Sequence, residues 1–112
     1  MNSRYVTVCV QDTARLYALV QRGREIADRA GCSLKVLLFV SLAGRCEEQA
    51  ELLEYTFQCA RQVDAEMSAF YTDEPIEKLM KDRSECLIVH GGETLTGEIL
   101  RRMPDRNLVV LE

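Results

Sequence analysis

Apolar and polar residues follow one another in short blocks along the chain, and each apolar block has the length of one strand or one helix face. Five apolar runs, rich in β-branched and aromatic residues, predict β-strands. Runs 34–40 and 86–90 are nearly continuous in apolar residues, which is typical of strands covered on both faces. Run 65–71 mixes polar and apolar residues and suits a sheet edge. The other two strands are predicted at 5–10 and 108–111.

Between these runs, apolar residues recur at the spacing of amphipathic helices. The first helix is predicted to follow Asp12 or Thr13, either of which can cap it, and to end at Gly31. Gly23 lies inside this helix, where glycine is unfavourable. We therefore expect Gly23 to let the helix lie close to the sheet.

Three further helices complete the pattern. An apolar stripe over 50–63 predicts the second helix, with Glu47, Glu48 and Glu51 in its first turns, where acids favour the helix dipole. A short helix starts at Pro75, and an amphipathic piece at 98–103 is closed by Pro104.

Strand and helix alternate throughout, which predicts one α/β domain over 1–112, a doubly wound, five-stranded parallel sheet between two helix layers. Right-handed crossovers place the first two helices on one face and the last two on the other.

Composition and charge narrow the classes of function. The chain has 112 residues, 47% hydrophobic and 29% charged, which is typical of a globular domain. A net charge of −4, with no basic run, argues against a nucleic-acid partner. The five cysteines form no CxxC pair and their number is odd, so we expect reduced thiols and no metal cluster. Three of them lie inside apolar patterns, where a core position is expected: Cys9, Cys59 and Cys86.

No long apolar segment occurs, so we expect neither a signal peptide nor a membrane span, and a cytoplasmic protein. Leu108–Leu111 is apolar and lies at a predicted sheet edge. Because open apolar edges are usually paired or covered, we expect a homodimer through this strand.

The strand at 86–90 ends at His90, Gly91 and Gly92, and this edge is where a ligand is expected. Ligands of open parallel sheets bind at the carboxyl ends of the strands, where the strand order reverses. Here the reversal falls between the first and fourth strands. The predicted ligand site therefore consists of residues that end or follow three strands: Gln11, Asp12, Thr13, Val40, His90, Gly91, Gly92 and Thr94.

Nearly the whole chain resembles the universal stress protein family. The likeness is carried by GREIADRAGCSLKVLLFV at 23–40, ARQVDAEM at 60–67, DEPIEKL at 73–79 and the strand that runs into Gly91. The chain is also similar to the stress-protein-like module of potassium-sensing histidine kinases. The resemblance implies strand order 3-2-1-4-5, frequent dimers and, in one branch, an adenine nucleotide at the switch point.

The phosphate-binding segment of that branch, G-x2-G-x9-G-[ST], is degenerate here. Thr94 stands three residues after Gly91 and Leu95 three after Gly92, so neither glycine begins the pattern. Arg15 and Arg45 are the cations near this edge, and acids in the second helix oppose a polyanion. This balance of charges favours a ligand that is smaller or less charged than ATP, or no ligand at all. ATP, ADP and AMP are the adenine nucleotides that the resemblance makes possible.

Three functions remain open at this point. The first is a non-catalytic regulatory module that binds an adenine nucleotide or a related ligand weakly. The second is an interaction scaffold that has lost nucleotide binding and acts through a regulatory protein partner. The third is an enzyme with His90 as acid or base, although no nucleophile stands at a motif spacing from it. Cys46 is expected to be the accessible cysteine, with an incidental role favoured over redox sensing.

Overall fold

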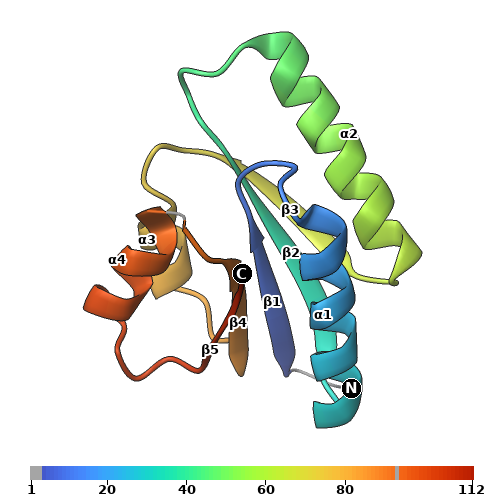
Figure 1. Cartoon of the computed structure of the whole chain (residues 1–112), viewed down its shortest axis with the longest axis vertical. Helices are drawn as coiled ribbons and strands as arrows, with labels where there is room; N and C mark the ends of the chain where they lie inside the picture. Colours follow the sequence, from blue (N-terminus) through green and yellow to red (C-terminus); the bar gives the residue numbers. More distant parts are fainter. Residues whose placement is uncertain (1–3, 93) are drawn as a thin grey trace.

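The computed structural model describes residues 4–92 and 94–112 and shows a five-stranded sheet between two layers of helices (Figure 1). The strands are β1 (Tyr5–Val10), β2 (Ser33–Val40), β3 (Glu66–Tyr71), β4 (Cys86–His90) and β5 (Leu108–Leu111). Their order is β3-β2-β1-β4-β5, and every neighbouring pair is parallel. The predicted fold class and strand order are confirmed.

The helices are α1 (Leu16–Ala30), α2 (Cys46–Gln62), α3 (Pro75–Met80) and α4 (Thr94–Arg102). Helices α1 and α2 pack on one face of the sheet, against a core that includes Val8, Leu38 and Ile88. Helices α3 and α4 pack on the other face, over Leu87 and Val89 (Figure 1). Since β4 contributes to both cores, its continuous apolar pattern is explained by burial on both faces.

Gly23 of α1 approaches the sheet as predicted. A Cβ atom at this position would lie 2.5 Å from Cγ2 of Val8 and 3.0 Å from Cδ1 of Leu34. Gly31 ends the helix in the left-handed conformation, with φ 68°, and Cys32 N–H donates to Ala27 O at 2.8 Å. This is the usual glycine stop of a helix.

Two helix starts differ from the predictions. Neither Asp12 nor Thr13 caps α1 with its side chain, because a turn that ends at Arg15, with φ 59°, separates both residues from the helix. The last helix begins at Thr94, earlier than the predicted 98, and includes Gly97. Its apolar face gives the reason: Leu95 and Ile99, four residues apart, are both buried against β4.

Charged residues close the amino ends of the strands. The Asp82 side chain is 3% exposed and lies between Lys35 of β2, 2.7 Å from its Nζ, and Arg106. Ser84 N–H donates to Asp82 Oδ2 at 3.0 Å, and Arg106 Nη2 donates to Ser84 O at 2.9 Å. Burial raises the pKa of the Asp82 carboxyl, but the hydrogen bonds from Lys35 and Ser84 outweigh it and hold this pKa below its usual value.

Candidate functional site

A cavity of about 400 Å³ lies at the carboxyl ends of β1 and β2. The residues that follow β1, the end of β2 and the first turns of α2 surround it. Its lining consists of Gln11, Asp12, Thr13, Val40, Ser41, Gly44, Arg45, Glu48, Gln49, Glu51 and Leu52. Four of the eight predicted site residues are therefore brought together here: Gln11, Asp12, Thr13 and Val40.

The β1 side of the cavity is shaped by the turn before α1. Asp12 Oδ1 accepts a hydrogen bond from Ala14 N–H at 2.8 Å, and Leu16 N–H donates to Thr13 O at 3.2 Å. These bonds keep Asp12 and Thr13 exposed beside the cavity instead of at the first turn of the helix. The second oxygen of the Asp12 carboxylate is available to accept a hydroxyl group of a ligand.

The opposite side is formed by the loop between β2 and α2, which is tied down at two points. Asp73 Oδ1 accepts from Ser41 Oγ at 3.0 Å and from Leu42 N–H at 3.1 Å. Gln49 Nε2 of α2 donates to Ser41 O at 2.7 Å. The chain's own hydrogen bonds thereby hold the loop as a wall of the cavity, which lowers the cost of ordering it on binding.

The charge of the lining is unfavourable to polyanions. Three lining residues are acidic, Asp12, Glu48 and Glu51, whereas Arg45 is the basic one. Arg45 Nη1 lies 3.8 Å from Glu48 Oε1, with both side chains largely exposed. Neutral groups of Gln11, Thr13 and Gln49 can donate and accept, and Val40 and Leu52 add apolar surface. Such a lining suits a ligand with an apolar ring and hydroxyl groups better than one with several phosphates.

The other four predicted residues lie at the end of β4 and the start of α4, outside the lining of this cavity. His90 is half-buried, and its carbonyl oxygen accepts from Thr96 Oγ1 at 3.0 Å. Gly91 N–H donates to Leu111 O at 2.8 Å, and Gly92 has φ 87°, a conformation that favours glycine. Four of the expected residues thus line the cavity, whereas His90, Gly91, Gly92 and Thr94 lie at the end of the neighbouring strand β4 and the start of α4.

Glu112 occupies the space beside this strand end. A Cβ atom added to Gly91 would lie 3.2 Å from Glu112 Oε1 and 3.1 Å from Val110 Cγ1. Arg15, one of the two expected cations, donates from Nη1 to the main-chain oxygen of Glu112. An acidic side chain therefore lies beside Gly91, and Arg15 is engaged by the chain itself.

The site prediction named neither Ser41 nor Gln49, although both line the cavity. Helix α2 begins at Cys46, and Glu47 and Glu48 lie in its first turn as expected, so the position of Gln49 beside the loop agrees with the predicted helix start. No pattern in the sequence indicates the hydrogen bond between Gln49 and Ser41. Cys46 is exposed as expected, and the other four cysteines are buried.

Within residues 4–92 and 94–112, no group of three or more His, Cys, Asp or Glu side chains is arranged to bind a metal ion. None of the helices described there has the length and apolar character required to cross a bilayer.

No family model matches the sequence, and no curated protein matches it either. Solved structures do. A universal stress protein from Archaeoglobus fulgidus is 16% identical, with 100% of this chain and 96% of that chain covered and a TM-score of 0.69. A structure of the universal stress protein from the same organism in complex with dAMP, also 16% identical, gives 0.65 with complete coverage of both chains.

A universal stress protein in complex with cAMP is 17% identical, with 98% of this chain and 99% of that chain covered and a TM-score of 0.55. At these identities the likeness shows the fold: this chain has the fold of universal stress proteins over its whole length.

Proposed function

We propose that this protein is a small, non-catalytic regulatory module that binds an adenine nucleoside, or a nucleotide with few phosphates, in the cavity between β1 and β2. The observation that carries the proposal is the lining itself: neutral hydrogen-bonding groups and apolar surface at the carboxyl ends of β1 and β2, with more acidic than basic residues. The structural neighbours that hold dAMP and cAMP support an adenine ligand in this fold.

The charges rank the adenine ligands. Asp12, Glu48 and Glu51 repel phosphates, and Glu112 lies beside Gly91, one of the glycines at which phosphates would be bound. We therefore expect adenosine and AMP to bind more tightly than ADP, and ADP more tightly than ATP, with AMP dissociation constants of about 0.1 mM. His90 does not line the cavity, so the proposal gives it no catalytic role.

Calorimetric titration with adenosine, AMP, ADP and ATP tests this ranking. Adenosine should bind at least about tenfold more tightly than ATP at low salt, because like charges oppose the phosphates. Glu48→Gln removes one acid from the lining and should reduce the difference in affinity between adenosine and ATP severalfold. Thr94→Ala, which lies outside the lining, should leave it unchanged.

A bound ligand must also raise the unfolding temperature by mass action. If millimolar adenosine and AMP give neither heat nor thermal stabilisation, the ligand proposal is wrong. The scaffold with a regulatory protein partner would then take its place, and Glu112 beside Gly91 is the observation that favours it.

The proposal includes a homodimer through β5, which lies at one edge of the sheet and exposes Val110. Light scattering should give a dimer at tens of micromolar, an order typical of weak dimers. Val110→Lys places a charge on this edge and should weaken the dimer. A monomeric wild-type protein at such concentrations would contradict this part of the proposal.

A further inference from the structure

One wall of the ligand cavity is held by a residue that lies outside the cavity. This wall is the β2–α2 loop, residues 41–45, and the residue is Asp73 of the β3–α3 loop, residues 72–74. Asp73 Oδ1 accepts hydrogen bonds from Ser41 Oγ at 3.0 Å and from Leu42 N–H at 3.1 Å. A single carboxylate oxygen from a distant part of the sequence therefore holds two consecutive residues of the wall.

Ser41 connects Asp73 to the lining of the cavity. Its Oγ, which donates to Asp73, also accepts from Ala43 N–H at 3.2 Å. Its carbonyl oxygen accepts from Gly44 N–H at 3.3 Å and from Gln49 Nε2 at 2.7 Å. Ser41, Gly44 and Gln49 all line the cavity, so a shift of Ser41 would move the other two.

The β3–α3 loop is bonded to the end of β2 as well. Thr72 N–H donates to Val40 O at 2.9 Å, and Thr72 Oγ1 accepts from Glu74 N–H at 3.0 Å. Val40 also lines the cavity. The β3–α3 loop thus contacts three consecutive residues at one side of the ligand site, at positions 40, 41 and 42, and the order of the two loops is linked.

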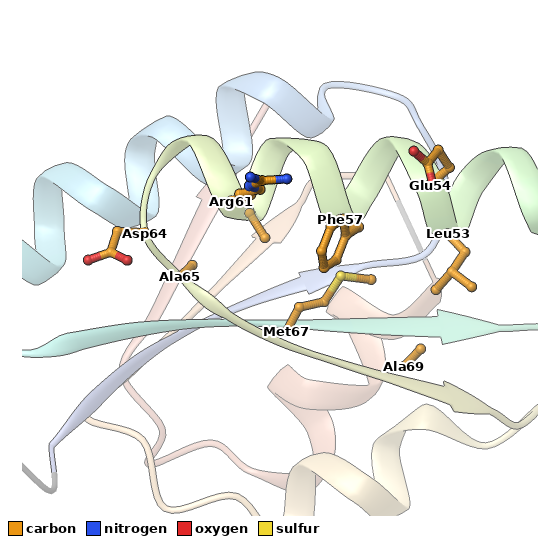
Figure 2. A pocket seen from close by; sticks show the side chains of 9 residues that line it. Leu53, Glu54, Phe57, Arg61, Asp64, Ala65, Met67 and Ala69 are labelled. Carbon is orange, nitrogen blue, oxygen red and sulfur yellow. The ribbon is translucent and has the colours of Figure 1, made fainter.

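Hydrogen bonds matter for this wall because burial contributes little to it. Residues 41–48 are exposed throughout, and the Leu42 side chain is 66% exposed. Farther along α2, a cavity of about 570 Å³ is lined by the helix and β3, where Phe57 lies over Met67 and is still 50% exposed (Figure 2). Since packing of α2 on β3 is incomplete, the loop that leads into α2 depends on its bonds to Asp73 and Gln49.

We propose that Asp73 is a positioning residue for the ligand cavity and links occupancy of the cavity to order in the β3–α3 loop. The inference rests on the proposed function, because it requires a ligand in this cavity. By holding Ser41 and Leu42, Asp73 keeps the wall in place before a ligand arrives, which lowers the cost of binding.

The link acts in both directions. Because coupling between two sites is reciprocal, a ligand that contacts the wall must also stabilise the bonds of Asp73. Asp73 and Glu74 are exposed, so a change at the surface of the β3–α3 loop follows occupancy of the cavity. A regulatory module requires such a change, since its partner must distinguish the occupied protein from the empty one.

Hydrogen exchange in the ligand-free protein, measured by NMR, tests the positioning role first. Asp73→Ala removes the acceptor, and Leu42 N–H should exchange about fivefold faster, as expected for the loss of one hydrogen bond. Asp73→Asn keeps Oδ1 as an acceptor and should preserve the slow exchange within about twofold. Glu77→Ala is the matched control, because Glu77 is an exposed acid of α3 whose described bonds are to Glu74.

Calorimetry with adenosine tests the effect on the site. Adenosine is neutral, so the loss of a negative charge at Asp73 does not change its electrostatic attraction to the protein. Asp73→Ala should weaken binding about fivefold, the cost of ordering the wall, whereas Asp73→Asn should remain within about twofold of the wild type. Recovery with asparagine, which removes the same charge as alanine, assigns the effect to the hydrogen bonds. Glu77→Ala should bind as the wild type does.

The link itself is measured at Glu74 N–H, which is bonded to Thr72 in the β3–α3 loop. Saturating adenosine should slow its exchange about threefold in the wild type, within the range of weak couplings, and leave it unchanged in Asp73→Ala.

Three outcomes would overturn the inference. They are unchanged exchange of Leu42 N–H in Asp73→Ala, unchanged affinity of that variant for adenosine, and no response of Glu74 N–H to adenosine in the wild type. The second and third leave the proposed ligand in place. A wild-type protein that binds neither adenosine nor AMP would instead remove the proposed function and the link together, while exchange of Leu42 N–H without ligand would still decide whether Asp73 holds the wall.

Discussion

The two ends of the sheet use charge in opposite ways. At the amino ends, Asp82 is 3% exposed and is bonded to Lys35 and Arg106. At the carboxyl ends, Arg45 and Glu48 lie 3.8 Å apart with 77% and 69% of their side chains exposed. The two groups of charges differ in their exposure to solvent. Ion pairs in water interact weakly, whereas a buried charge depends on its partners for stabilisation.

The comparison shows that buried bonds close the amino ends of the strands, the closed end, whereas the carboxyl ends, the open end, carry exposed side chains. Asp82 joins three segments: β2, the loop before β4 and the loop before β5. The loops at the carboxyl ends are joined by more exposed bonds, such as that of Gln49 to Ser41. Their side chains are therefore available to a ligand, while those of the amino ends are used for stability.

The largest expected effect breaks the closed end. Asp82→Ala leaves Lys35 and Arg106 partly buried without their carboxylate and should lower the free energy of unfolding by about 2–3 kcal/mol. Glu48→Ala at the open end should change it by less than about 0.5 kcal/mol. Urea denaturation at pH 7 measures both, and equal effects would contradict the contrast between the two ends.

The next effect compares two glycines. In Gly23→Ala the new methyl group would lie 2.5 Å from the buried side chain of Val8, and the overpacking should outweigh the gain in helix propensity. We expect a loss of about 1–2 kcal/mol. The control is Gly44→Ala, whose methyl group would lie 2.7 Å from Nε2 of Gln49, a flexible side chain that can move. Thermal unfolding should show a clear decrease in the unfolding temperature for Gly23→Ala only.

The smallest expected effect concerns the stability of the protein at low pH. The pKa of Asp82 is lower in the folded protein than in the unfolded chain. The carboxylate therefore contributes its full stability above about pH 4, the usual pKa of an aspartate in an unfolded chain. This contribution is lost as the pH falls through the folded pKa. Asp82→Asn lacks it, so the difference in stability between wild type and variant should shrink below about pH 4. Parallel stability curves for the two proteins between pH 7 and 3 would show that Asp82 does not act in this way.

Much of the fold could be predicted because its signals are local. The five apolar runs, the glycine stop at Gly31 and the close approach at Gly23 each follow from a few neighbouring residues. The start of α4 could not be predicted in the same way, since Gly97 resembles a loop residue until Leu95 and Ile99 are seen to share one buried face. The packing of α4 on the sheet decided its length, because burial outweighs the unfavourable propensity of one glycine.

The sequence by itself determined three features, through hydrophobic spacing and the handedness of crossovers. They are the alternation of strands and helices, the assignment of helices to the two faces, and the edge of the sheet at which a ligand is expected. Tertiary structure alone decided that His90, Gly91, Gly92 and Thr94 lie outside the cavity that Gln11, Asp12, Thr13 and Val40 help to line. It alone also placed Asp82 between Lys35 and Arg106, and Glu112 beside Gly91. The physical reason is that these contacts join side chains from separate segments, whose distances are set by packing and not by position along the chain.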